Sequence, residues 1–171
     1  AKSYSLGYKE SGGGCDLIHL SELEFDTILR FGYRLTMRME PDLVRLQQLI
    51  SEAHHLVFVF PIWWGSYPAL LKGFIDRVFL PGYAFSSISS CSPEKKLMGK
   101  SATAIVTSDT PKWYYRLVYK QPAYYLIKRS LLSYCGITNV KFMYLCPVTK
   151  SSLRTREQWI EKVYRLGMRL R

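Results

Sequence analysis

The sequence predicts a parallel, doubly wound α/β domain. Three apolar runs, at residues 55–60, 100–107 and 140–146, are the expected strands. The first is apolar at every position from Leu56 to Phe60 rather than at alternate ones, which is typical of a strand covered on both faces. Helical patterns lie between the runs, and this alternation indicates a parallel sheet with helices on both sides. A length of 171 residues suits a single domain over residues 1–171.

The first part of the chain supplies two expected helices and one short expected strand. Residues 1–11 have a helical face, and the glycines at 12–14 end that helix. Residues 15–20 are expected to form a strand. Residues 21–39 have weak periodicity and are expected to be loop. A helix then begins at Pro41, where proline is tolerated.

The later helices are marked by their starts and stops. A helix is expected over residues 68–79, and a serine-rich excursion over 86–96. Another follows Pro122 and closes at Gly136, and Ser152 is the expected N-cap of the last one. The side chains expected to face the core from the 68–79 helix are Leu70, Phe74, Ile75 and Val78.

The formal net charge of +11 has three explanations. A basic patch interleaved with tyrosines is one signal of nucleic-acid binding. Attraction of a phosphorylated small molecule, such as a nicotinamide dinucleotide, is the second, and a solvated basic surface is the third. No nucleic-acid-binding motif is present, so no specific nucleic-acid partner is expected. The patch in question consists of Lys112, Arg116, Lys120, Lys128 and Arg129.

Several features favour a cytoplasmic location without membrane insertion. No apolar run approaches the roughly 20 residues that span a bilayer. The first four residues have no apolar core of a signal peptide. The four cysteines form no C-x-x-C pair and lie inside apolar patterns, as expected for buried thiols in a reduced compartment.

Two consecutive tryptophans, Trp63 and Trp64, follow the 55–60 run after Pro61. Open α/β sheets bind their ligands at the carboxyl ends of the strands. Consecutive side chains of an extended segment point to opposite sides, so at most one indole is expected in the core. The hypothesis is a stacking platform for a planar heterocycle, contacted partly through the backbone of residues 61–65. Core packing is the alternative.

Polar groups follow the next strand, at residues 107–110 (Thr-Ser-Asp-Thr). Their hydroxyls and N–H groups could bond the rim of a heterocycle, although the same residues also form ordinary turns. Tyr114 and Tyr115 come next, and either phenol could donate a proton or simply pack. The histidines have no metal-ligand spacing, so no metal site is expected. The absence of G-x-S-x-G and H-E-x-x-H argues against a triad hydrolase and a zincin.

Residues 55–79, HLVFVFPIWWGSYPALLKGFIDRVF, closely resemble the signature of flavodoxin-like NAD(P)H:quinone oxidoreductases. Residues 81–85, 99–100 and 107–110 follow in the order of that family, and the resemblance covers nearly the whole chain. Residues 107–116 are similar to a subgroup of NAD(P)H dehydrogenases. The resemblance implies a flavodoxin-like sheet, a homodimer, and bound FMN or FAD that carries hydride from NAD(P)H to a quinone or similar acceptor.

The resemblance also implies roles for individual residues. Tyr115 matches a tyrosine that assists charge on the reduced flavin and is the expected catalytic residue. Gln121 stands about where the family often has a partner histidine. Trp64 and Phe85 match residues on the substrate side. The residues matched to cofactor binding, which lack the usual paired glycines of the second loop, are Pro61, Ile62, Trp63, Trp64, Gly65, Thr107, Ser108, Asp109 and Thr110.

The family has a first strand and a phosphate-binding loop ahead of the helix at which this sequence starts. That strand would be central, between residues 15–20 and 55–60. Either those two strands pair directly, another chain fills the gap, or the sequence is a piece of a longer product. Because the phosphate loop is outside the sequence, the alternative function is a non-catalytic flavodoxin-like binding or regulatory module.

Overall fold

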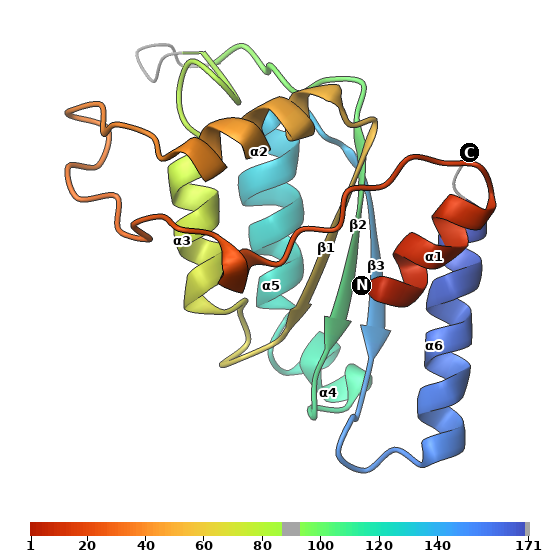
Figure 1. Ribbon diagram of the computed structural model, residues 1–171. Coiled ribbons are helices and arrows are strands. Elements are labelled where there is room, and N and C mark those ends of the chain that lie inside the picture. Colours follow the sequence, from red (N-terminus) through yellow and green to blue (C-terminus); the bar gives the residue numbers. More distant parts are fainter. Residues whose placement is uncertain (87–92, 170–171) are drawn as a thin grey trace.

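Three parallel strands form the centre of the fold in this computed structural model, which describes residues 1–86 and 93–169. The strands are β1 (His55–Pro61), β2 (Ser101–Thr107) and β3 (Asn139–Leu145), and they lie in the order β1-β2-β3. Helices cover both faces of this sheet, so the molecule has three layers (Figure 1). The predicted parallel, doubly wound α/β fold is confirmed.

The two helical layers come from different parts of the chain (Figure 1). The first and last helices, α1 (Lys2–Glu10) and α6 (Leu153–Met168), lie together on one face. The helices on the other face are α2 (Pro41–Glu52), α3 (Ala69–Val78) and a long helix that begins as α5 (Pro122–Tyr125) and continues as the π-helical segment η2 (Leu126–Ser133). A short helix, α4 (Lys112–Leu117), lies beyond the carboxyl ends of the strands.

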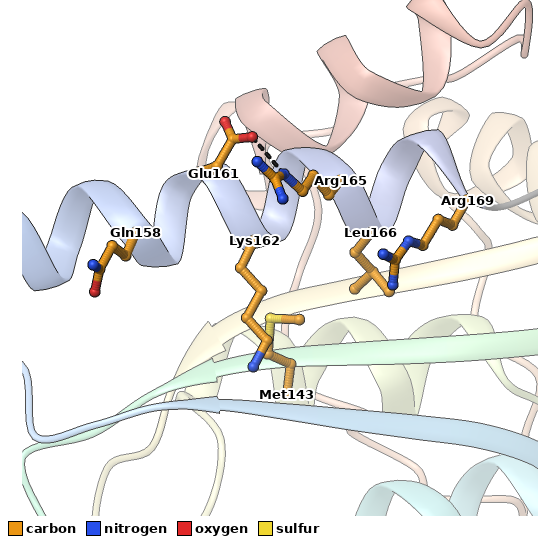
Figure 2. Close-up of a pocket in the computed structure, with 7 residues that line it drawn as sticks. All are labelled: Met143, Gln158, Glu161, Lys162, Arg165, Leu166 and Arg169. Atoms are coloured by element: carbon orange, nitrogen blue, oxygen red, sulfur yellow. Dashed lines mark hydrogen bonds and ion pairs between the residues drawn. The ribbon is translucent and has the colours of Figure 1, made fainter.

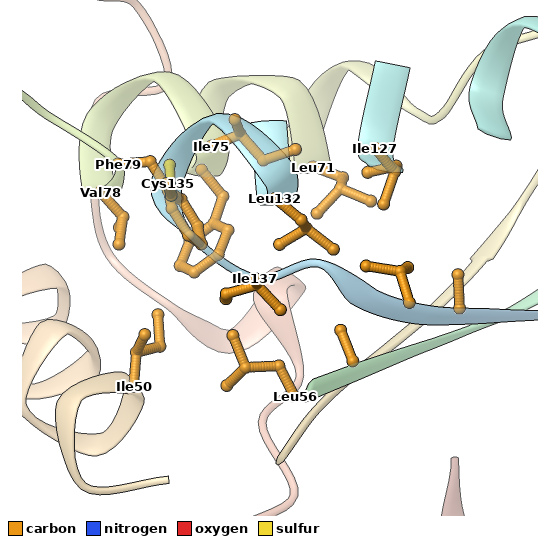
Figure 3. Packing of buried hydrophobic residues seen from close by; sticks show 14 of the residues in the cluster. Ile50, Leu56, Leu71, Ile75, Val78, Phe79, Ile127, Leu132, Cys135 and Ile137 are labelled. Carbon is orange, nitrogen blue, oxygen red and sulfur yellow. The ribbon is translucent and has the colours of Figure 1, made fainter. Parts of the chain in front are cut away.

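The main core lies between the sheet and the α2, α3 and η2 layer. Figure 3 shows aliphatic side chains from these helices meeting Leu56 of β1 and Ile137, which precedes β3. Strand β2 is buried from Ala102 to Val106, as expected for the middle strand. Helix-facing residues with no exposed surface in this core include Leu43, Val78, Ile127 and Leu132.

The layer of α1 and α6 buries less apolar surface, but the backbones of its two helices approach each other closely. Its fully buried apolar residues are Tyr4, Val163 and the β2 residue Ile105. The two helices meet at glycines: a Cβ at Gly7 would lie 2.2 Å from the Tyr164 carbonyl oxygen. Close packing therefore depends on glycine having no side chain, because an added methyl group would force the helices apart.

The expected strand at residues 15–20 is wrong. The structure has an extended stretch there, followed by a single 3-10 turn, η1 (Leu20–Glu22). A strand requires partners for its N–H and C=O groups, and within the described residues β1 pairs only with β2. Direct pairing of the two expected strands is therefore not observed. With one edge free, β1 is less covered than its apolar sequence predicts, and Val59 is 43% exposed.

The other predicted elements are confirmed with shifts of one or two residues at their ends. The Ser152 hydroxyl caps α6 by accepting a hydrogen bond from the Thr155 N–H at 3.1 Å. One expected core residue of α3, Leu70, is exposed, whereas Leu71 is buried. Residues 71, 74, 75 and 78 have the spacing of one helical face, which Leu70 does not share. Most of the expected 86–96 excursion lies outside the described residues.

Two further expectations concern membrane-spanning helices and the burial of the cysteines. Among the described helices, none is long and apolar enough to cross a membrane. Cys135 is buried, as expected, while Cys15 and Cys146 are half-buried and Cys91 lies outside the described residues. Burial raises the pKa of the Cys135 thiol to about 11.

A buried arginine on α3 fixes the long connection before α2. Arg77 is 0% exposed and donates to the Asp26 carbonyl at 2.7 Å and to the Arg38 carbonyl at 3.1 Å. Its guanidinium also binds the Glu40 carboxylate at 2.7 Å. One turn earlier, a Cβ at Gly73 would lie 2.5 Å from the Thr27 Cβ. The connection therefore contacts two successive turns of α3, at Gly73 and at Arg77.

Candidate functional site

A cavity of about 540 Å³ lies where β1 and β2 end. Its size is within the range of small-molecule and cofactor sites. Two of its walls come from the segment after β1 and from Thr110 in the loop after β2. The other walls come from α4, from the segment after it and from the first residue of α5. The lining residues are Ile62, Trp64, Gly65, Thr110, Tyr115, Tyr119 and Pro122.

The segment after β1 is a tight turn rather than the extended chain expected from the sequence. Trp63 and Ser66 exchange two backbone hydrogen bonds of 2.9 Å. Between them, Trp64 has φ 50° and Gly65 has φ 77°, which is the pattern of a type I′ turn. Both indoles are exposed, and Trp64 is 105% exposed. The Trp64 side chain is therefore outside the core and available for stacking.

Positive φ is costly for a residue as bulky as tryptophan, by about 1–3 kcal/mol. Trp64 thus occupies a strained backbone position without gaining core packing. Strain of this kind persists only where the surrounding structure holds the chain in place. Three hydrogen bonds hold the turn: the Ile62 N–H donates to the Thr107 carbonyl at 2.8 Å, and the Gly65 carbonyl accepts from the Ala123 N–H at 3.1 Å and from a buried phenol at 3.0 Å.

That phenol belongs to Tyr115, whose hydroxyl is fully engaged. It donates to the Gly65 carbonyl at 3.0 Å and accepts from the Ala123 N–H at 3.0 Å. Burial raises the pKa of Tyr115, and the hydrogen bond from Ala123 opposes this rise only in part. The phenol is therefore neutral at ordinary pH and ties the turn to the start of α5. Its expected catalytic role stays a prediction.

The loop after β2 uses most of its polar groups to hold itself in place. The Asp109 carboxylate accepts from the Thr149 N–H at 2.6 Å, and this bond lowers the pKa of Asp109. The Ser108 hydroxyl accepts from the Thr110 N–H at 3.0 Å. Thr107 is half-buried at the end of β2. Of the four residues predicted here, Thr110 alone lines the cavity.

Two residues that the sequence did not identify complete the cavity: Tyr119 and Pro122. The Tyr119 ring meets the Tyr115 ring edge-on, with 6.3 Å between centroids. Between Tyr119 and Pro122 the chain reverses at Lys120 and Gln121, which both have positive φ. Nothing in the residue pattern indicated left-handed backbone there. The only available signal was the concentration of tyrosines in this stretch.

Several predicted site residues lie elsewhere. Pro61 and Trp63 do not line the cavity. Phe85 is buried in the main core, where its ring packs edge-on against Tyr134 at 5.0 Å between centroids. Tyr134 follows η2 and leads to the amino end of β3, so Phe85 lies away from the cavity. The turn at residues 81–85 folds Phe85 inward, and its expected place on the substrate side stays a prediction.

A second cavity, of about 450 Å³, lies between α6 and β3 on the other side of the sheet (Figure 2). Figure 2 shows Lys162 extending toward Met143 and an ion pair between Glu161 and Arg165, whose N–O distance is 2.6 Å. No predicted site residue lines it. Its walls are exposed charged side chains of α6 above an apolar floor, so we assign the functional site to the cavity at the strand ends.

Comparison with known proteins agrees with the observed fold. A family model described as a flavodoxin-like fold matches residues 1–166. A Haemophilus influenzae protein named uncharacterized NAD(P)H oxidoreductase is 34% identical over 103 residues, which are 59% of this chain and 50% of that protein. Human ribosyldihydronicotinamide dehydrogenase (quinone) is 34% identical over 99 residues, which are 56% of this chain and 42% of that protein.

A solved structure matches over a larger share. The crystal structure of Smu.1420 from Streptococcus mutans UA159 superposes with a TM-score of 0.81 at 28% identity. The match covers 99% of this chain and 92% of that one. By contrast, the chain spans about half the length of the curated relatives it matches.

Proposed function

Because the chain belongs to the flavodoxin-like family, we propose that it is a flavin-dependent NAD(P)H oxidoreductase acting on a quinone or similar acceptor. One observation carries the proposal. The cavity at the strand ends is lined by residues from both predicted motifs, with the exposed indole of Trp64 beside it. The names of the relatives, an NAD(P)H oxidoreductase and a quinone-linked dehydrogenase, support the same reaction.

The residues of this cavity fit the ring system of FMN or FAD. Trp64 offers a flat face, and Thr110, which also lines the cavity, offers a hydroxyl. Gly65, at φ 77°, lets the backbone approach a ligand closely. When bound, the flavin supplies the hydride chemistry. The protein then binds and orients the ring: Trp64 stacks on it, Thr110 bonds its polar edge, and Tyr115 holds the turn.

The alternative is a non-catalytic binding or regulatory module of the same fold. It is favoured by the charge of the cavity, since none of its seven lining residues is a lysine or an arginine. The phosphate of a flavin nucleotide would therefore have no cation in this wall. This alternative predicts the same fold and the same stability, without flavin-dependent turnover.

Titration with FMN and FAD separates the two functions. We expect quenching of flavin fluorescence on addition of the purified protein, because Trp64 stacks on the ring. We also expect quinone-dependent oxidation of NADH or NADPH in the loaded protein, followed by absorbance at 340 nm. Quenching without turnover would favour the binding module. Neither quenching nor turnover with either flavin would contradict the proposal.

Replacement of Tyr115 by phenylalanine tests how this residue acts. We expect the free energy of unfolding to fall by about 1 kcal/mol, because one buried hydrogen-bond bridge between Gly65 and Ala123 is lost. Flavin affinity should fall only slightly, because the direct hydrogen bond from the Ala123 N–H to the Gly65 carbonyl, at 3.1 Å, still holds the turn carrying Trp64. Urea denaturation and flavin titration measure the two effects. Tyr33→Phe is the control, because Tyr33 is exposed and does not line the cavity. Unchanged stability with slower flavin reduction would instead show a catalytic phenol.

The resemblance also implies a homodimer, and we include it in the proposal. Sedimentation equilibrium of the purified chain tests it directly. A monomer at micromolar concentration would overturn this part of the proposal and leave the flavin site untouched. Cytoplasmic location is likewise a proposal, tested by fractionation of cells that make the protein.

A further inference from the structure

The carboxyl edge of the sheet carries an exposed apolar surface that the proposed reaction does not use. Residues 112–120 form this surface, which we call the α4 rim. Within it only Tyr114 and Tyr115 are covered. Trp113 is 63% exposed, Leu117 is 60% exposed and Val118 is 51% exposed. Figure 1 shows α4 beyond the strand ends, with no other helix over it.

The same rim is positively charged. It contains Lys112, Arg116 and Lys120 and no acidic residue. None of the three takes part in the ion pairs found among the described residues. The excess of positive charge extends beyond the rim in the sequence. Residues 101–156 contain five lysines and four arginines against a single acidic residue, Asp109. That carboxylate is already bound to the Thr149 N–H.

We propose that the α4 rim docks on the surface of an anionic lipid bilayer. Tryptophan and tyrosine favour the boundary between headgroups and acyl chains, where one end of each ring is apolar and the other is wet. Leucine and valine enter the acyl boundary, and lysine and arginine reach back to anionic headgroups. The rim presents all three kinds of side chain within nine residues.

Charge complementarity selects this occupant over the others. A second copy of the chain bound through the same rim would oppose three cations with three cations. A nucleic acid would match the charge and could stack on Trp113, but it offers no apolar environment for Leu117 and Val118. An anionic bilayer satisfies both the charge and the apolar residues.

Docking would also place the cavity at the lipid surface. Tyr119 is part of the rim and lines the cavity, so the two surfaces are continuous. An apolar quinone dissolved in the bilayer would then reach the cavity without crossing water. This consequence rests on the proposed function, whereas the docking itself depends only on residues 112–120.

Co-sedimentation with lipid vesicles tests the proposal. The probes are vesicles of phosphatidylcholine alone and vesicles that also contain phosphatidylglycerol. We expect binding to the anionic vesicles that weakens as salt rises. Lys120→Gln should weaken it about fivefold, the effect of one cation near such a surface. Leu117→Ser should also weaken it, and the matched controls Lys9→Gln and Leu6→Ser, at exposed positions of α1, should not.

Three results would overturn the proposal. The first is equal binding, or none, to the two kinds of vesicle. The second is binding that survives both rim substitutions. The third is protein that does not bind vesicles but is retained on a nucleic-acid column, or forms a dimer, through Leu117 and Lys120. Flavin quenching of the same samples is read separately, so failure of docking is distinguishable from failure of the proposed function.

Discussion

Replacing Arg77 with methionine is expected to lower the free energy of unfolding by about 3 kcal/mol. Removing one partner of a buried ion pair typically costs about 3–5 kcal/mol. The lower end applies because the Glu40 side chain is 27% exposed and can be solvated in part. The carbonyls of Asp26 and Arg38 lose their guanidinium donor as well. Urea denaturation at neutral pH measures the loss.

The location of the damage distinguishes this effect from general loss of packing. Hydrogen exchange should show faster exchange across residues 24–40 while the β2 amides stay protected. Arg30→Met is the matched control. Arg30 forms an ion pair with Asp26 at the surface, and the Arg30 side chain is 57% exposed. Exposed pairs of this kind contribute at most about 1 kcal/mol. Equal losses in the two variants would contradict a special role for Arg77.

The Arg77 effect is expected to depend on pH through Glu40. Burial alone would raise the pKa of Glu40, but hydrogen bonds from the Asp26 N–H and from Arg77 outweigh it and hold that pKa below its ordinary value of 4.5. A carboxyl whose pKa is lowered by folding adds stability above pH 4.5, and that stability disappears as pH falls through the folded pKa. The difference between wild type and Arg77→Met should therefore shrink in acid. A difference that stays constant from pH 7 to pH 3 would contradict this coupling.

Local periodicity predicted most of the fold. The strands and long helices follow from apolar spacing, from Pro41 and from the cap at Ser152, all of which act over a few residues. The strand expected at residues 15–20 failed because a strand depends on a neighbour, which a local pattern does not reveal. Arg77 was missed for the same reason: its partners, at residues 26, 38 and 40, are distant in sequence.

Part of the predicted site meets at one cavity, but the backbone conformation of its residues was not predicted. The rule that ligands bind at the carboxyl ends of parallel strands led to Trp64 and Thr110, and both line the cavity. The sequence did not show that Trp64 lies in a tight turn, since left-handed backbone is unusual for tryptophan. Nor did it show Tyr119, which reaches the cavity through a reversal at Lys120 and Gln121. Both omissions are backbone conformations that composition does not encode.

Replacing Trp64 with asparagine is expected to change stability and flavin binding in opposite directions. Asparagine adopts positive φ readily, and Asn-Gly is a preferred pair for a type I′ turn. The exposed indole makes no core contact to lose. The free energy of unfolding should therefore rise by about 1 kcal/mol. Loss of the stacking face should cost about 1–3 kcal/mol of binding, or roughly five- to 150-fold in Kd.

Trp63→Asn is the matched control, because Trp63 is an exposed indole of the same turn outside the left-handed region. It should not stabilise the protein, and it should weaken flavin binding less than Trp64→Asn. Urea denaturation and fluorescence titration with FMN and FAD measure both quantities on the same samples. A residue kept only for packing would lose stability on substitution, and an incidental surface residue would leave binding unchanged. Gain of stability together with loss of binding would therefore identify Trp64 as a residue held in a strained position for its ligand.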